Sequence, residues 1–360
     1  MIDCDVHCAP ASMDVLLPYL SDYWRQYLEG AMIGLHGLID AYPPGAPTSA
    51  SERARSFPAP AVPSGYPALR ERVLDEADAE LIVLNCLTAL EAHRNPYYAA
   101  ALATAVNDWV RDEFLSRDER LRASIALSIA VPDDAVAEIE RRADDPRWVQ
   151  VLLPVRSELP WGHPSHHAIF AAAERHGLAI GLHAWGRPGQ APTPNGFTST
   201  YFEDYLANQA VAQSQLVSLV CEGVFERYPD LRVVLIECGF AWLAPLLWRF
   251  DKDWKGIWRE VPWVKQLPSE YVYRHVRATT APAHLPREPR AIRQLLETID
   301  VGRLLAYASD YPHDHGGGLP RLLSELDNER RDAVLTTNAA ALYNRARPDR
   351  SPDRDGVSAP

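Results

Sequence analysis

Three short polar motifs in this sequence end apolar segments and contain the residue types that bind metal ions. Asp5 and His7 lie two residues apart near the N-terminus, His183 ends a second apolar segment, and Asp310 ends a third. Because side chains alternate between the faces of a strand, Asp5 and His7 are expected to point to the same side. Buried polar groups are costly unless they have partners. Two imidazoles and two carboxylates brought together would make a site for zinc or a similar divalent ion.

Each motif by itself also has a purely structural explanation. An Asp-x-His pair can cap a helix or hydrogen-bond locally, His183 can be a core histidine with satisfied nitrogens, and Asp310 can begin a helix. The prediction of a metal site therefore depends on a fold that brings the three segment ends together.

Eight apolar segments that alternate with amphipathic stretches predict such a fold. Helices are expected at 95–115, 133–142, 166–176, 202–228 and 289–298, and strands at 2–6, 80–86, 122–129, 148–153, 179–183, 232–236, 275–280 and 304–309. This alternation is typical of a parallel sheet. Eight such strands predict a (β/α)₈ TIM barrel, an α/β fold in which the carboxyl ends of all strands converge on one site. An open doubly wound sheet is the alternative.

Length and composition agree with one large domain. The chain has 360 residues, of which 47% are hydrophobic, and α/β barrels of this size form one domain. We expect a barrel domain over 1–345. Residues 40–66, rich in Pro, Ala, Ser and Gly, are expected to form an insertion loop over the barrel mouth. The charged tail 346–360 is expected to be disordered.

The charge and the ends of the chain restrict its partners. A net charge of −12 argues against nucleic acid or an anionic membrane and leaves a small-molecule substrate as the expected partner. No apolar run reaches the ~20 residues that a membrane span needs. The N-terminus also lacks the basic and apolar regions of a signal peptide, so a cytoplasmic protein is expected.

The aromatic- and arginine-containing run 248–263 is expected to be a surface or dimer-contact helix, and a homodimer is the expected assembly.

Four motifs carry a resemblance to a known family. They are Asp-Cys-Asp-Val-His-Cys-Ala-Pro at 3–10, His-Ala-Trp-Gly at 183–186, Glu-Cys-Gly-Phe-Ala-Trp-Leu-Ala-Pro at 237–245 and Ala-Ser-Asp-Tyr-Pro-His at 308–313. In order and spacing the sequence resembles the amidohydrolase-related family. This is the branch of the amidohydrolase superfamily that includes aminocarboxymuconate semialdehyde decarboxylase and γ-resorcylate decarboxylase. The likeness extends over residues 2 to 345 and implies that Asp5, His7, His183 and Asp310 are metal ligands.

One divalent ion per chain is expected. Relatives with two metals often use a carboxylated lysine on the fourth strand, but the lysines of this chain are Lys252, Lys255 and Lys265, all after the sixth expected strand. Zinc is the expected ion. Asp5 is acidic where aminocarboxymuconate semialdehyde decarboxylase has a histidine. This harder ligand makes manganese or iron alternatives.

Further residues are expected around the metal. Many relatives have a histidine at the end of the sixth strand, where this chain has Glu237. Glu237 could act as a general base if burial raises its pKa, or it could make a salt bridge or a cap. His313 matches the family pattern after Asp310 and is expected near the active-site mouth. Trp185 and Arg187 are candidates for holding an aromatic ring or a carboxylate of the substrate.

The expected function is that of a metal-dependent hydrolase acting on a small carboxylated or aromatic metabolite. The metal would lower the pKa of a bound water toward ~7, and Asp310 would accept the proton. The alternative is a metal-dependent non-oxidative decarboxylase, in which the metal holds the substrate carboxylate while a carbon is protonated. Glu237 in place of histidine favours hydrolysis. The complete set of ligand-type residues argues against a third possibility, a barrel that only binds.

Overall fold

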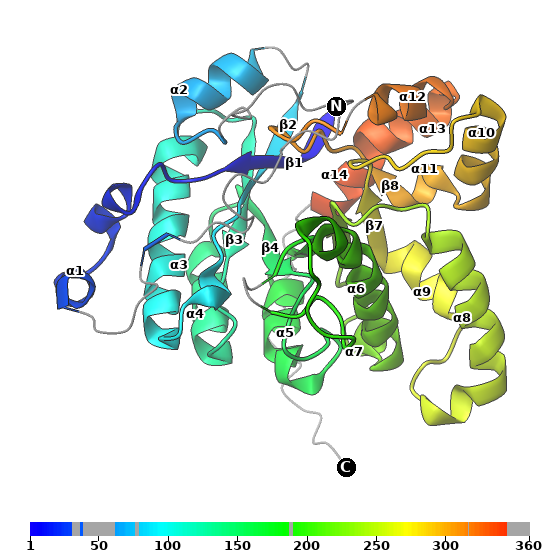
Figure 1. The fold of residues 1–360 in the computed structure, drawn as a ribbon, viewed down its shortest axis with the longest axis horizontal. Coiled ribbons are helices and arrows are strands. Elements are labelled where there is room, and N and C mark those ends of the chain that lie inside the picture. Colours follow the sequence, from blue (N-terminus) through cyan, green and yellow to red (C-terminus); the bar gives the residue numbers. More distant parts are fainter. Residues whose placement is uncertain (31–36, 39–61, 76–78, 187–189, 316, 344–360) are drawn as a thin grey trace.

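A computed structural model describes residues 1–30, 37–38, 62–75, 79–186, 190–315 and 317–343. Eight parallel strands follow one another around a single sheet in the order of the sequence (Figure 1). They are β1 (Ile2–Cys8), β2 (Leu81–Cys86), β3 (Leu121–Ala126), β4 (Trp148–Pro154), β5 (Ala179–His183), β6 (Val233–Ile236), β7 (Val276–Thr279) and β8 (Leu305–Ala306). Sequential order excludes the doubly wound sheet, in which the strand order reverses.

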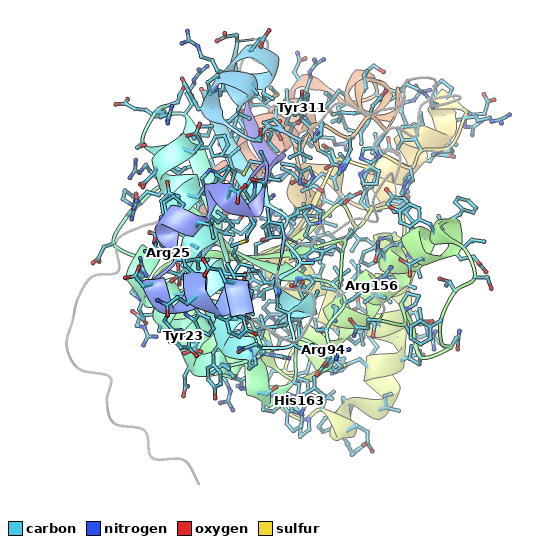
Figure 2. All side chains as sticks on the ribbon, turned by 60° about the vertical axis from the view of Figure 1, so that its left-hand side comes forward. Tyr23, Arg25, Arg94, Arg156, His163 and Tyr311 are labelled. Carbon is cyan, nitrogen blue, oxygen red and sulfur yellow. The ribbon has the colours of Figure 1, made fainter. Side chains whose placement is uncertain are left out.

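Backbone hydrogen bonds join β1 to the segment that follows β8 and bring the barrel close to closure. The Cys4 amide donates to the Tyr307 carbonyl at 3.0 Å, and the His7 amide donates to the Tyr311 carbonyl at 2.8 Å. Tyr311 lies beside β1 (Figure 2). The prediction of a TIM barrel is confirmed. The eighth strand is shorter than the predicted 304–309, because Leu304 ends α11 and the amides of Tyr307 and Ser309 bond to Val334 and to the Asp3 side chain.

Helices alternate with the strands and cover the outside of the barrel (Figure 1). They are α1 (Asp22–Gly30), α2 (Tyr66–Leu69), α3 (Pro96–Val110), α4 (Pro132–Arg142), α5 (His167–Arg175), α6 (Tyr201–Cys221), α7 (Val224–Arg227), α8 (Leu243–Ile257), α9 (Pro268–His275), α10 (Pro289–Thr298), α11 (Val301–Leu304), α12 (Gly318–Ser324), α13 (Asn328–Asp332) and α14 (Asn338–Tyr343).

Capping residues explain where several of these helices begin. The Asn95 side chain accepts the amides of Tyr97 and Tyr98 at the start of α3, and Thr200 with Glu203 forms a capping box at the start of α6. The predicted helix 95–115 is confirmed, with a π-helical turn over Arg111–Leu115 as its last part.

Two element boundaries differ from the sequence prediction. The single helix predicted over 202–228 is wrong: the chain forms α6 and α7, separated at Gly223. Gly223 has φ of 69°, a left-handed conformation that ends an α-helix. The strand predicted over 122–129 ends earlier, at Ala126.

Several expectations concern regions that the structure does not test. Most of the insertion loop 40–66 and the whole tail 346–360 fall outside the described residues. No helix within the described ranges combines the length and apolar character needed to cross a membrane. Trp248 and Ile257 of α8 are 63% and 62% exposed, and the homodimer expected from this region stays a prediction.

Candidate metal centre

Asp5, His7 and His183 converge inside the carboxyl end of the barrel. Asp5 and His7 come from β1, and His183 is the last residue of β5. All three side chains are buried, and one donor atom from each lies within 4.8 Å of the other two. Nε2 of His183 is 3.6 Å from Oδ2 of Asp5, and Nε2 of His7 is 3.9 Å from Oδ1 of Asp5. The spacing of two residues on β1 therefore places both side chains in the interior, as expected.

Asp310 joins this group from the segment after β8. Its amide donates to the Asp5 carbonyl at 3.0 Å, so its backbone is held against β1. Its Oδ1 atom accepts from Nε2 of His7 at 2.6 Å and from Nδ1 of His313 at 3.0 Å. Its Oδ2 atom contacts Nε2 of His315. Three imidazoles thus surround one fully buried carboxylate.

Several donor atoms of the centre have no hydrogen-bond partner among the described residues. They are Oδ2 of Asp5, Nδ1 of His7 and both ring nitrogens of His183. A buried polar atom without a partner costs about 1–3 kcal/mol, so most are satisfied in folded proteins. Of these atoms, Oδ2 of Asp5 and Nε2 of His183 face each other at 3.6 Å. A carboxylate oxygen and an imidazole nitrogen in this arrangement suit zinc, manganese or a similar divalent ion. The residues present fit such an ion.

Electrostatics of the buried groups follow from their mutual contacts. Burial lowers the pKa of His7, but the Asp5 charge and the hydrogen bond to Asp310 outweigh it and raise that pKa to about 9. Burial would raise the pKa of Asp310, but its three imidazole partners hold it well below the usual range. The pKa of His315 is raised, because Asp310 outweighs the effect of burial. Contact with Asp310 therefore favours the protonated forms of His7 and His315 and the ionised form of Asp310.

Glu237 lies on the far side of His183 from Asp5. It directly follows β6 with φ of 57°, and the side chain is almost fully buried. Its Oε2 atom is 3.9 Å from Nδ1 of His183, and its Oε1 atom accepts from the Tyr205 hydroxyl at 3.2 Å. Glu237 also groups with Asp310, His313 and His315 as a second set of donor atoms within 4.8 Å.

Two residues of this site are not among the sequence predictions. Tyr205 comes from α6, and nothing distinguishes it in the sequence from other helical tyrosines. His315 has no role in the sequence predictions, but its ring contacts Asp310. The spacing Asp-x-x-His-x-His over 310–315 was a signal that could have placed it.

The two expected substrate-binding residues have different outcomes. Trp185 is 5% exposed, its ring centroid is 5.0 Å from that of His183, and its indole donates to Oε1 of Glu91 at 2.8 Å. Burial raises the pKa of Glu91 to about 7. Arg187 lies outside the described residues. Trp185 thus packs beside the centre, and its contact with a substrate stays a prediction, as does that of Arg187.

Two known proteins similar in sequence to this chain are γ-resorcylate decarboxylases. γ-Resorcylate decarboxylase of Rhizobium sp. (strain MTP-10005) is 24% identical over 293 residues, which cover 76% of this chain and 86% of the relative. The enzyme of the same name from Rhizobium radiobacter is 24% identical over 262 residues, covering 68% and 76%.

Solved structures show the same fold at lower identity. A 2,6-dihydroxybenzoate decarboxylase from Rhizobium is similar with a TM-score of 0.65 and 17% identity, over 95% of this chain and 98% of that one. A 5-carboxyvanillate decarboxylase from Novosphingobium aromaticivorans, with bound manganese, has a TM-score of 0.67 and 16% identity, over 95% and 96%. The sequence profile of the amidohydrolase family matches residues 2–345. With this match over nearly the whole barrel, the chain belongs to the amidohydrolase family.

Proposed function

We propose that this protein is a metal-dependent non-oxidative decarboxylase of a small aromatic carboxylic acid. The observation that carries the proposal is the similarity to γ-resorcylate decarboxylase over 76% of the chain. Hydrolysis, the first expectation from the sequence, depended on Glu237 in place of histidine. The relatives favour the alternative, carboxy-lyase chemistry, over it.

Asp5, His7, His183 and Asp310 are the proposed ligands of one divalent ion. The partnerless donor atoms of Asp5, His7 and His183 support this assignment. When bound, the ion would hold the substrate carboxylate and a neighbouring oxygen by Lewis-acid attraction. Bound manganese in the Novosphingobium aromaticivorans structure supports manganese beside zinc as the ion.

Asp310, with His313 and His315, is the proposed proton source. Loss of CO₂ from an aromatic acid breaks the bond between the ring carbon and the carboxyl carbon, and a C–H bond takes its place. One proton must therefore reach that ring carbon, and the electron pair of the broken bond stays with the ring. Asp310 is in hydrogen-bond contact with both imidazoles, so a proton can pass from either ring through Asp310 to the carbon.

Glu237 and Tyr205 are proposed to orient the ring. The Glu237 carboxylate already accepts one hydroxyl hydrogen bond, from Tyr205. A phenolic hydroxyl of the substrate could donate to the same carboxylate, which would place the ring between Glu237 and Asp310. Glu237 would then act in binding rather than as the general base of a hydrolase.

A parallel assay separates the two chemistries. Metal-replete protein is incubated in D₂O with hydroxybenzoates, aryl lactones and aryl amides, and CO₂ and acid release are followed together. We expect CO₂ from hydroxybenzoates and one deuterium at the vacated ring position by NMR. Acid release from lactones or amides without CO₂ would refute decarboxylation and support hydrolysis.

A further inference from the structure

We propose that hydrogen-bonded side chains inside the barrel position the Asp5 carboxylate for the metal. We call Tyr343, Gln150, Ser124 and Asn85 the interior network. It begins on α14, crosses β4 and β3, and reaches β2 beside the ligand strand β1. The inference rests on the metal site proposed above and adds positioning residues to it.

Every hydrogen bond of the interior network donates toward Asp5. The Tyr343 hydroxyl donates to Oε1 of Gln150 at 3.2 Å, and Nε2 of Gln150 donates to the Ser124 hydroxyl at 2.8 Å. The Ser124 hydroxyl donates to Oδ1 of Asn85 at 2.6 Å. Nδ2 of Asn85 then donates to Oδ1 of Asp5 at 2.7 Å. Hydrogen bonds in such a series polarise one another in the same direction, so the last bond, to the carboxylate, is strengthened.

The ionised form of Asp5 that a cation needs fixes this direction. If the Asn85 amide were reversed, its oxygen would face the Asp5 carboxylate, and two acceptor atoms would be in contact. Asn85 is fully buried, so water could not separate them. An ionised Asp5 therefore requires the NH₂ group of Asn85, and the hydroxyl of Ser124 and the amide of Gln150 can align with it.

Gly181 provides the space that Gln150 occupies. Gly181 lies on β5, and a Cβ atom there would be 2.4 Å from Nε2 of Gln150 and 2.5 Å from its Cδ. Real Cβ atoms do not approach other atoms so closely, so an alanine would push the Gln150 amide out of place. Gln150 is itself fully buried. The sequence thus combines a buried amide on one strand with a glycine on the next.

The Asp5 carboxylate therefore has one oxygen that accepts a hydrogen bond and one without a hydrogen-bond partner. Oδ1 of Asp5 is held by Asn85, whereas Oδ2 has no hydrogen-bond partner among the described residues and lies 3.6 Å from Nε2 of His183. Groups that orient metal ligands in this way typically change metal affinity 10–100-fold when removed. We assign this role to Asn85 directly and to Ser124 and Gln150 through it.

The test measures binding of Mn²⁺ alone to the purified full-length protein, by the EPR signal of free Mn²⁺. We expect Asn85→Ala to bind Mn²⁺ about 10–100-fold more weakly than the wild type. The Co²⁺-loaded variant should also show a shifted visible spectrum, which a general loss of stability would not produce. Asn107→Ala is the matched control. Asn107 is an equally buried asparagine, but it bonds Ala126 and Glu138 outside this network, so its variant should keep wild-type affinity.

Two milder variants keep the test decisive if Asn85→Ala does not fold. Ser124→Ala and Gly181→Ala should each weaken Mn²⁺ binding in the same direction, Gly181→Ala without removing any polar group. Wild-type affinity in the folded network variants would overturn the interior network while leaving the metal site intact. Wild-type binding in His183→Ala would instead refute the metal site, and the role of the network with it.

Discussion

Two clusters of buried charge in this protein are built in opposite ways. The outer cluster (Asp108, Glu138, Arg142, Asn107 and Thr104) lies between α3 and α4, on the outside of the barrel. Arg142 donates to Oε1 of Glu138 at 2.6 Å and to Oδ1 of Asp108 at 2.8 Å. Thr104 donates to Oε2 of Glu138 at 2.7 Å, and Arg141 takes the remaining oxygen of Asp108 at 2.8 Å. Every carboxylate oxygen of the outer cluster is therefore paired.

The metal centre has buried carboxylates too, but its pairing is incomplete. Asp310 pairs with imidazoles, whose charge depends on pH, and four donor atoms of Asp5, His7 and His183 have no hydrogen-bond partner among the described residues. The side chains of the outer cluster satisfy one another's hydrogen bonds. The metal centre instead keeps donor atoms without a hydrogen-bond partner, as a site for an added metal ion would. Donor atoms without a partner therefore distinguish the metal centre from the outer cluster, although both clusters are buried and charged.

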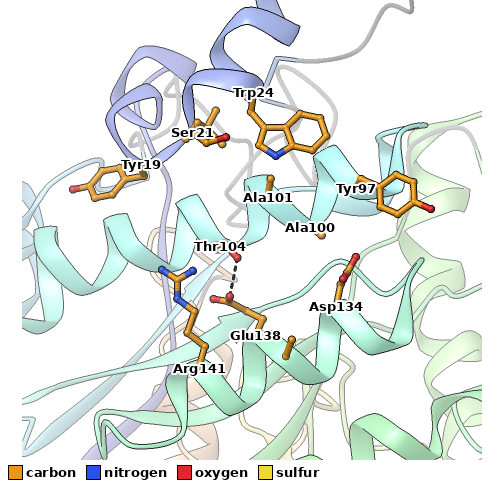
Figure 3. A pocket seen from close by; sticks show the side chains of 12 residues that line it. Tyr19, Ser21, Trp24, Tyr97, Ala100, Ala101, Thr104, Asp134, Glu138 and Arg141 are labelled. Carbon is orange, nitrogen blue, oxygen red and sulfur yellow. Dashed lines mark hydrogen bonds between the residues drawn. The ribbon is translucent and has the colours of Figure 1, made fainter.

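A cavity of about 510 Å³ lies over the outer cluster and is lined by Tyr19, Trp24, Tyr97, Thr104 and Arg141 among others (Figure 3). The hydrogen bond from Thr104 to Glu138 crosses its floor. Thr104, Glu138 and Arg141 in the wall of this cavity are already paired, unlike the open donor atoms of the metal centre.

The largest expected effect is on stability and comes from the outer cluster. Arg142→Leu leaves Asp108 and Glu138 without their shared buried cation, and loss of one partner of such a pair costs about 3–5 kcal/mol. Denaturant unfolding measures the loss, and Mn²⁺ affinity should not change. Arg141→Leu is the control, because Arg141 is half exposed and its ion pair is worth about 0–1 kcal/mol. Equal losses of unfolding free energy in Arg142→Leu and Arg141→Leu would contradict the role of Arg142 as the buried cation of the outer cluster.

The second effect is on catalysis at the metal centre. Asp310→Asn should lower kcat by ~10²-fold or more, because the proposed proton source is removed. Glu237→Gln should keep its metal content and lose less activity, since Glu237 is proposed to orient the substrate. Steady-state kinetics with metal analysis of each variant measures both. A nearly normal Asp310→Asn enzyme beside an inactive, metal-loaded Glu237→Gln enzyme would reverse the two roles.

The smallest effect is the pH dependence of the metal-free protein. The pKa of His7 rises from 6.5 to about 9 on folding, so the stabilisation by protonated His7 is complete below pH 6.5 and is lost as pH rises toward 9. We expect the unfolding free energy to fall over this window. Apparent metal affinity should rise over the same window, because a ligand imidazole must be deprotonated. Urea unfolding at several pH values, with His7→Asn as reference, measures the slope; an equally steep slope in His7→Asn would exclude His7 as its source.

Local pattern predicted the barrel, because each strand is an apolar segment and most of the gaps between strands contain an amphipathic stretch. It failed at Gly223, where one residue in a left-handed conformation divides a helix, and at β8. That strand ends early because the amides of Tyr307 and Ser309 bond to Val334 and Asp3, and Asp3 lies at the opposite end of the sequence. Boundaries set by such long-range contacts leave little local signal.

The proposed ligands Asp5, His7, His183 and Asp310 could be selected from sequence because each ends an apolar segment, and strand ends of a barrel meet at one place. The structure brings these four together, although their binding of metal stays a prediction. Their open donor atoms, and the choice of Asn85 and Gln150 as supports for Asp5, were decided only by tertiary structure. Asn85 is 80 residues from Asp5 and Gln150 is 65 from Asn85. The sequence determines which polar residues must be buried, but their partners depend on how neighbouring strands align, since the geometry of a hydrogen bond is set by atoms that only the folded barrel brings into contact.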